Sequence, residues 1–194
     1  MPIQAPWRNL VAEPVKHDHL VQVYRDERVL VEAVALFASA AISRHEAVIL
    51  IATGAHAGKV ERSLESEGLE IEELKRWGQL TILEAEDVLA RFMVDGMPDP
   101  DLFKGVIREL VGSVKGTGRR FRAVRAYGEM VDLLWSANLP AAIRLEELWN
   151  EVILEHSISL FCAYALDGEG QSEQMFPADI RVLHNHLIPV AGCA

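Results

Sequence analysis

A carboxylate and a phenol near the ends of two apolar segments are the first candidates for chemistry in this sequence. Glu129 follows the run FRAVRAYG, and Tyr164 lies near the end of the run ISLFCAYA. Both runs have the composition of buried β-strands, and the segment between them has the apolar spacing of a helix. A strand–helix–strand unit builds a parallel sheet, which binds ligands beyond the carboxyl ends of its strands. The sequence therefore predicts a binding site at that edge of the sheet.

Glu129 has both a functional and a structural interpretation. It could hold a metal-bound water, as in nucleotide hydrolases, or accept a hydrogen bond from a bound ligand. Arg125 lies four residues earlier, so a regular strand would place the two side chains on one face, roughly 13 Å apart. They would meet only if the chain turned back at Gly128. In the structural interpretation, Arg125 forms a surface ion pair and Glu129 stabilises the first turn of a helix through its dipole.

Further polar side chains lie on the elements that flank this edge. On the helix after Pro140, Glu146 and Asn150 are one turn apart at the border of the apolar face. They could reach into a crevice or hydrogen-bond each other. Cys162 and Tyr164 alternate onto one face of the last predicted strand, where a cysteine usually serves as inert packing.

Histidines near both ends of the chain raise the question of a metal site. They form two H-x-H pairs, His17 with His19 and His184 with His186. Each pair could ligate a metal if the two ends of the chain met. No C-x-x-C or H-E-x-x-H pattern accompanies them, and terminal histidines are often exposed, so we expect no metal site.

Residues 53–60, TGAHAGKV, occupy the place of a phosphate-binding loop, because they follow an apolar segment and open a helix. That loop requires Gly at its first position and Ser or Thr at its last. Here these positions hold Thr53 and Val60, so the usual Mg²⁺ ligand is missing. We interpret the segment as a turn with an exposed lysine. No Ser–His–Asp order or Gly-x-Ser-x-Gly elbow is present either, so no catalytic residue and no cofactor are predicted.

Composition narrows the class of partner. The chain of 194 residues has a formal net charge of -10, which disfavours nucleic acid and anionic membrane surfaces as partners. It has two cysteines, Cys162 and Cys193, so a disulfide scaffold is not indicated. The first residues lack the pattern of a signal peptide, and no apolar stretch is long enough to span a bilayer. We therefore expect a cytoplasmic protein.

The order of elements predicts the α/β class. Apolar strand segments alternate with helical segments and no hairpin signal is evident, which favours a single-domain, three-layer sandwich with a mostly parallel sheet of five or slightly more strands. Residues 1–16 are expected to form an N-terminal arm that packs on the domain or on a partner. Residues 17–190 form the domain, with a C-terminal helical segment at 177–188. The predicted strands are residues 20–24, 47–52, 80–83, 121–127 and 159–165.

Six short segments, in order along the chain, match one known family. They are HLVQVY (19–24), VDGMPDP (94–100), RAYGEMVDLLW (125–135), RLEELWN (144–150), FCAY (161–164) and HNHLIP (184–189). Through them, residues 17–190 resemble the MEDS domain, the methanogen/methylotroph, DcmR sensory domain. The resemblance implies a RecA/KaiC-like ATPase fold without a working phosphate loop. It also implies a cytoplasmic sensory domain of prokaryotic signal transduction that binds a small organic molecule, such as a simple hydrocarbon derivative.

The resemblance also implies a set of ligand-binding residues. One position departs from the family, since some relatives have a cysteine where this chain has Val21, which puts sensing by that thiol in doubt. The implied partner is a signalling protein of the histidine-kinase, anti-sigma or response-regulator type, and a homodimer is compatible with it. Two other classes stay open: a RecA/KaiC-like nucleotide-binding protein or ATPase, and a docking protein that binds no ligand. The implied ligand-binding residues are His19, Tyr24, Arg125, Glu129, Glu146, Asn150, Cys162 and Tyr164.

Overall fold

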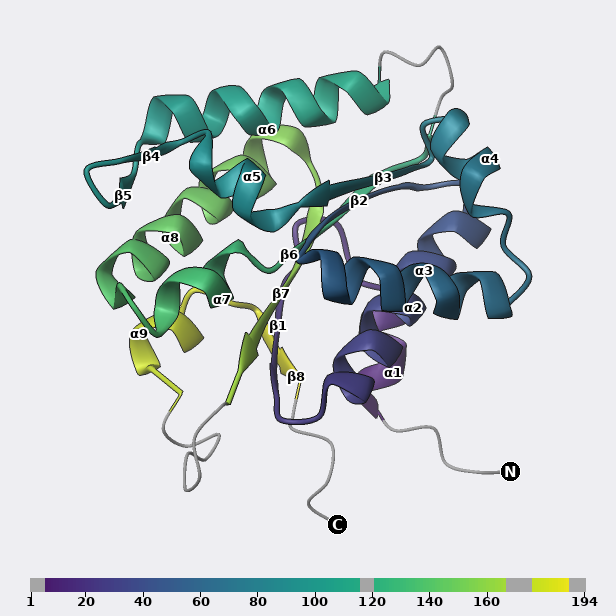
Figure 1. Ribbon diagram of the computed structural model, residues 1–194, viewed down its shortest axis with the longest axis horizontal. Coiled ribbons are helices and arrows are strands. Elements are labelled where there is room, and N and C mark those ends of the chain that lie inside the picture. The colour runs from purple at the N-terminus through teal and green to yellow at the C-terminus, as the bar shows by residue number, and fades with distance from the viewer. Residues whose placement is uncertain (1–5, 116–120, 167–175, 189–194) are drawn as a thin grey trace.

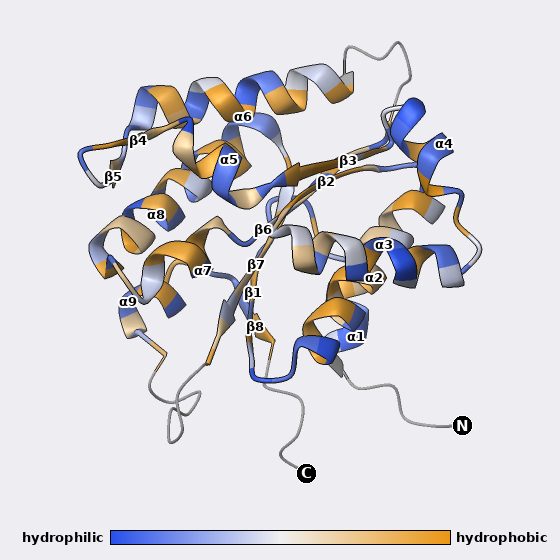
Figure 2. Ribbon diagram, viewed as in Figure 1, coloured by the Kyte–Doolittle hydropathy of each residue, from blue (hydrophilic) through white to orange (hydrophobic). Residues whose placement is uncertain are grey.

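The computed structural model describes residues 6–115, 121–166 and 176–188. In these residues a central sheet is covered by helices on both faces, which gives three layers (Figure 1). Hydrophobic residues make up most of the central strands (Figure 2), and buried apolar side chains form one core on each face of the sheet. The predicted α/β sandwich is confirmed.

The main sheet is parallel throughout, in the order β3-β2-β6-β7-β1-β8. Strand β2 has the sequence AVILIA, and all six of its residues are buried, as expected for a strand covered on both faces. The five predicted strands are all present, and β8 is a sixth at the sheet edge. The strands are β1 (His19–Tyr24), β2 (Ala47–Ala52), β3 (Leu80–Glu84), β6 (Val124–Gly128), β7 (Ser159–Ala165) and β8 (His186–Ile188).

Two groups of helices cover the two faces. The first group, against one face, is α1 (Pro6–Ala12), α2 (Glu27–Ser43), α3 (Gly54–Ser66) and α4 (Ile71–Arg76). The second group, against the other face, is α5 (Ala85–Ala90), α6 (Pro100–Lys115), α7 (Met130–Trp135), α8 (Leu139–His156) and α9 (Ala178–Arg181). Helix α8 begins at the N-cap Asn138, whose side chain accepts a hydrogen bond from the Ala141 amide, and ends at Ser157 in the left-handed conformation. None of the described helices has both the length and the apolar character needed to cross a lipid bilayer.

A short hairpin corrects one expectation from the sequence. Strands β4 (Met93–Val94) and β5 (Met97–Pro98) pair antiparallel, although no hairpin was predicted. Asp95 and Gly96 connect them with φ angles of 49° and 79°. Asp-Gly is the pair that tolerates two consecutive positive φ angles in a two-residue turn, so the hairpin signal was in the sequence.

The two ends of the chain also differ from the expectation. The arm predicted at residues 1–16 contains α1, which packs on α2 and buries Val11 completely. The helical segment predicted at 177–188 is helical only in α9. After it, the Asn185 amide donates to the His19 carbonyl at 2.9 Å, and β8 pairs with β1. The exposed edge of β1 offers backbone hydrogen bonds to this segment, and pairing outweighs its weak preference for a helix.

Candidate functional site

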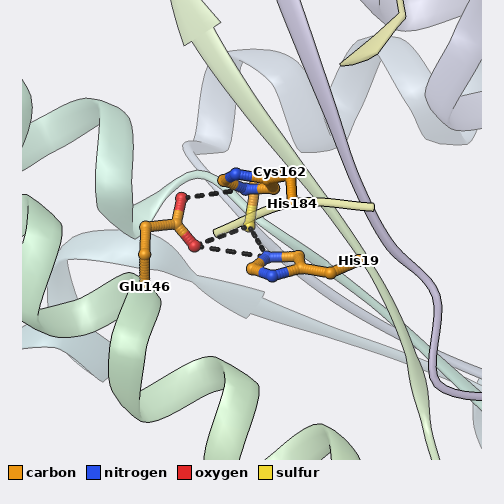
Figure 3. Close-up of side chains that lie close together, drawn as sticks. All are labelled: His19, Glu146, Cys162 and His184. Atoms are coloured by element: carbon orange, nitrogen blue, oxygen red, sulfur yellow. Dashed lines mark hydrogen bonds and ion pairs between the residues drawn. The ribbon is translucent and has the colours of Figure 1, made fainter. Parts of the chain in front are cut away.

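A buried polar cluster lies between the sheet and α8. It consists of His19 in β1, Cys162 in β7, Glu146 on α8 and His184, which follows α9. Figure 3 shows their polar atoms facing one another, and one ligand-type atom from each residue lies within 4.8 Å of those of the others. The side chains of His19, Glu146 and His184 are at most 1% exposed. We call these four residues the buried cluster.

The fold explains why four segments far apart in sequence meet here. Strands β1 and β7 are neighbours, and in their register Val21 lies opposite Cys162. His19 and Val21 share a face of β1, so His19 and Cys162 point toward the same helices. Helix α8 covers that face and presents Glu146 to it. Pairing of β8 with the free edge of β1 then brings His184 to the site.

Hydrogen bonds fix the orientation of the His19 ring. Its Nδ1 lies 3.0 Å from Asn150 Oδ1 and 3.2 Å from the Leu183 carbonyl, and both of these are acceptors. Asn150 Nδ2 in turn donates to the Leu183 carbonyl at 2.9 Å. Nδ1 therefore carries the hydrogen of the neutral ring. Its Nε2 faces Glu146 Oε2 at 3.2 Å and Cys162 Sγ at 3.4 Å.

His184 is held in a similar way from the other side. Its Nδ1 lies 2.8 Å from the carbonyl of Ile180, to which it donates. Its Nε2 lies 3.3 Å from Glu146 Oε1, but it is buried without a hydrogen-bond partner. The rings of His19 and His184 are 4.0 Å apart between centroids. Both imidazoles thus turn their Nε2 atoms toward one carboxylate.

Electrostatics in the cluster are strongly perturbed. Burial alone would raise the pKa of Glu146, but His184 and His19 outweigh it and hold this pKa far below its usual value. Burial and the neighbouring His184 lower the pKa of His19, against the effect of Glu146. Burial, with the charge of Glu146, raises the pKa of the Cys162 thiol well above its usual value. An ionised carboxylate beside a neutral imidazole and a protonated thiol is the state expected near neutral pH.

An aromatic wall closes one side of the cluster. The hydroxyl of Tyr164 donates to Glu146 Oε1, and its ring packs edge-on against Trp135 and Phe176, with centroids 5.7 and 5.0 Å away. Burial, together with the Glu146 carboxylate, raises the pKa of Tyr164, so the phenol stays protonated and keeps donating. The site therefore combines a charged centre with an apolar wall.

A second polar group lies at the carboxyl ends of β2 and β6. Glu129 accepts hydrogen bonds from the Tyr127 hydroxyl at 2.7 Å and the Thr53 amide at 2.8 Å, and it pairs with His56 Nδ1 at 2.8 Å. His56 Nε2 also pairs with Glu27 at 2.8 Å. The bond to Glu129, against partial burial, raises the pKa of His56. All three donors to Glu129 come from the protein itself.

The phosphate-loop position at the N-terminus of α3 is filled in the same way. Glu129 Oε2 accepts a hydrogen bond from the Thr53 amide, and Glu84 Oε1 accepts one from the Gly54 amide at 3.1 Å. A Cβ on residue 54 would lie 3.0 Å from Glu84 Oε2, which shows how closely this carboxylate approaches. Two carboxylates therefore occupy the place where a P-loop binds phosphate, in addition to the missing motif residues.

The residues predicted from the sequence divide among three places. Five of them, His19, Glu146, Asn150, Cys162 and Tyr164, come together in or beside the buried cluster. Glu129 lies in the second group, and the ring of Tyr24 contacts His56 there.

Arg125 is not brought to Glu129. Its Nε donates to Glu46 Oε2 at 2.6 Å, and its Nη1 donates to carbonyls of α1 and α2, including that of Ala12 at 3.0 Å. Arg125 lies near the amino end of β6, whereas Glu129 follows its carboxyl end. The contacts of Arg125 are therefore structural ones that hold α1 against the sheet.

Sequence reasoning left two residues out of the predicted site, His184 and His56. The H-x-H spacing was the signal for His184, and the segments that carry His19 and His184 do lie side by side. Only one histidine of each pair takes part: His17 bonds to the Ile153 carbonyl, and His186 lies beside Asp18. Two surface cavities, of about 900 and 770 Å³, are lined by other residues than the buried cluster.

Comparisons with known proteins agree with this fold. The profile of the MEthanogen/methylotroph, DcmR Sensory domain matches residues 18–184. A KaiC-like protein from the hyperthermophilic archaeon Pyrococcus horikoshii is similar in structure, with a TM-score of 0.56 over 89% of this chain and 71% of that one. The two sequences are 14% identical, so the similarity concerns the fold. No curated protein sequence matches the chain.

Proposed function

Because the chain belongs to the MEDS family of sensory domains, we propose that it binds a small organic molecule at the buried cluster and relays the binding to a partner protein. The sensory role follows from the family. The ligand class, the relay and a cytoplasmic location are our proposal. The observation that carries it is the convergence of Glu146, two imidazoles and a thiol at a site with an aromatic wall.

Such a cluster is poorly explained as a device for stability. Removing a carboxylate from water costs several kcal/mol, and replacing a buried ionic group by apolar residues is often neutral or stabilising. Perturbed ionisable groups therefore concentrate at functional sites. Glu146 is fully buried and still ionised, which supports a binding role for the groups around it.

The position of the cluster suggests how binding is transmitted. His184 and the Leu183 carbonyl belong to the C-terminal segment 176–188, whereas Asn150 and Glu146 belong to α8. A ligand changes an equilibrium only if it prefers one of two conformations. A molecule that inserts beside Tyr164 would alter the contacts that hold this segment, and we propose that the segment carries the signal outward.

Nucleotide hydrolysis is the weaker alternative. Glu129 and Glu84 already accept the first amides of α3, and their negative charge opposes a phosphate there. The lysine of the degenerate loop, Lys59, forms an ion pair with Glu27. These contacts support a binding domain over an ATPase.

The proposed partner is a signalling protein of the histidine-kinase, anti-sigma or response-regulator type. The net charge of -10 supports a protein partner over nucleic acid.

Thermal-shift titration tests the ligand proposal. The panel is small alcohols, acids, amines and halocarbons, with Mg·ATP and Mg·GTP as the competing class. A ligand at one hundred times its dissociation constant should stabilise the protein by about 2.7 kcal/mol. Tyr164→Phe should lose the response to an organic ligand. Tyr127→Phe, which removes a comparable bond to Glu129, should keep it.

The outcomes separate the alternatives. A shift with nucleotide alone would reject the proposal in favour of an ATPase-like protein. No shift with any compound would favour a docking protein. An organic response that both tyrosine variants retain would move the binding site away from the buried cluster.

A further inference from the structure

We infer that the buried cluster is a tetrahedral site for a divalent transition-metal ion of the zinc type, ligated by His19, Glu146, Cys162 and His184. The inference deepens the proposed function, on whose site it rests, but its test needs no organic molecule. No contiguous metal motif is present in the sequence, and the expectation from the motifs was no metal site.

The separations of the donor atoms carry the inference. Zinc bonds of about 2.0–2.3 Å to N, O and S place the corners of a tetrahedron about 3.3–3.6 Å apart. Nε2 of His19 lies 3.2 Å from Glu146 Oε2 and 3.4 Å from Cys162 Sγ. Nε2 of His184 lies 3.3 Å from Glu146 Oε1, and Cys162 Sγ lies 3.7 Å from Glu146 Oε2. These four separations, which involve both oxygens of the Glu146 carboxylate, are within about 0.2 Å of the tetrahedral range. One ligand atom from each of the four residues lies within 4.8 Å of those of the others.

The direction of the lone pairs supports the same conclusion. Nδ1 of His19 and Nδ1 of His184 both face acceptors, so a ring that binds a metal through Nε2 keeps its hydrogen on Nδ1. Both Nε2 atoms, the ring nitrogens left free to ligate a metal, face the Glu146 carboxylate, at 3.2 and 3.3 Å. In His184 this atom is buried and has no hydrogen-bond partner. A cation between the rings and the carboxylate would satisfy all of these acceptors at once.

The surroundings have the further features of a metal site. Ligating histidines usually donate their other ring hydrogen to a carbonyl, carboxylate or similar acceptor, which fixes the ring. His19 does so to Asn150 and the Leu183 carbonyl, and His184 to the Ile180 carbonyl. Charge also balances, because one carboxylate and one thiolate neutralise a divalent ion in a place that water does not reach.

The donor set selects the class of metal. Two imidazoles, a thiolate and a carboxylate suit Zn²⁺, or Co²⁺ as its substitute, whereas Mg²⁺ and Ca²⁺ prefer oxygen ligands only. The Cys162 thiol becomes a thiolate when it binds the metal, and this change can be followed by absorption spectroscopy. Cobalt bound to a thiolate shows a charge-transfer band that the free ion lacks.

The test uses the full chain after chelator treatment. We expect one equivalent of Zn²⁺ to bind, measured by elemental analysis. Co²⁺ should give the intense absorption of a tetrahedral site and the thiolate charge-transfer band. Cys162→Ser should lose that band, whereas Cys193→Ser, which changes the other cysteine of the chain, should retain it.

Variants in the C-terminal histidine pair provide a matched control. His184→Gln removes one donor and should weaken Zn²⁺ binding at least roughly 100-fold, since loss of an outer partner alone costs about 10–100-fold. His186→Gln changes the half-exposed member of the pair and should bind as the wild type does. Asn150→Ala removes a positioning residue, and it should weaken binding about 10–100-fold while keeping the charge-transfer band.

The inference is overturned if the wild-type chain binds less than one equivalent, if no thiolate band forms, or if His184→Gln and His186→Gln bind equally. Circular dichroism of each variant shows whether the fold is kept, and His184 itself lies outside the helices and strands, between α9 and β8. Metal binding without any organic response would reject the proposed ligand alone. If the metal-free protein responds to an organic compound but does not bind Zn²⁺, the metal site is rejected and the proposed function is kept.

Discussion

At the scale of single residues, two buried glutamates follow different rules. Glu129 accepts hydrogen bonds from three groups of the protein, and these stabilise its negative charge. Glu146 accepts from Tyr164, and the Nε2 atoms of two histidines face it, of which that of His184 is buried without a hydrogen-bond partner. The first arrangement is complete as it stands, whereas we propose that a cation or a ligand completes the second. This difference is the reason for placing the functional site at Glu146.

The ion pair of His56 with Glu129 predicts a pH-dependent contribution to stability. The folded-state pKa of His56 is raised, chiefly by its hydrogen bond to Glu129, against partial burial. The contribution is therefore complete below the unfolded pKa of about 6.5, and it is lost as the pH rises through the higher folded value. We expect His56→Gln to lower the free energy of unfolding more at about pH 6 than at about pH 9.

Urea unfolding at the two pH values measures this difference. In the Glu129→Gln background the partner charge is gone, so the effect of His56→Gln should depend much less on pH. An equal loss at both pH values in the wild-type background would contradict the assignment.

At the scale of elements, α8 is the helix on which the site depends. Its apolar stripe packs on the sheet, and the same face presents Glu146 and Asn150. Its first turn is held by Asn138, which accepts from the Ala141 amide and donates to the Gly96 carbonyl of the hairpin. The N-cap thus joins the position of α8 to the hairpin.

Removal of this cap should be measurable. We expect Asn138→Ala to lower the free energy of unfolding by about 1 kcal/mol, because a first-turn amide loses its acceptor. Thr53→Ala is the matched control, since the N-cap Thr53 of α3 makes no side-chain capping bond. If the two variants differ by less than about 0.3 kcal/mol in urea unfolding, the cap of α8 is not the stabilising contact described here.

At the scale of the whole molecule, helix α1 and the C-terminal segment 176–188 are both attached to the sheet by specific polar contacts. Arg125 bonds to Glu46 and to carbonyls at the end of α1, which holds the N-terminal helix. At the other end, β8 and His184 hold the C-terminal segment against β1. The first attachment is purely structural, and the second passes through the candidate site.

Arg125 should therefore affect stability without affecting the site. Arg125→Met leaves Glu46 without its partner, and we expect a loss of about 3 kcal/mol in unfolding free energy. The Zn²⁺ affinity should be unchanged. Arg28→Met, which breaks the exposed pair with Asp26, should leave the unfolding midpoint where it is. If folded Arg125→Met binds Zn²⁺ more weakly than the wild type, Arg125 contributes to the site and its role is not purely structural.

Much of the fold could be predicted from the sequence, and part of the site. The five strands were predicted because apolar runs such as AVILIA mark buried strands, and alternation placed Cys162 and Tyr164 on one face. The burial of Glu146 could not be seen, since a border position on a helix is exposed or buried according to what packs beside it. The packing partner here is the His184 segment, whose strand β8 forms only by pairing with β1.

The most direct test of the account is hydrogen exchange in β8. We propose that binding at the buried cluster fixes the C-terminal segment through His184. The measurement compares amide exchange in chelator-treated protein with that after one equivalent of Zn²⁺. We predict that Zn²⁺ slows amide exchange at residues 185–188. Exchange in β2 and β3, which lie at the opposite edge of the sheet from β8, should not change. Equal exchange at residues 185–188 in both states would contradict the claim.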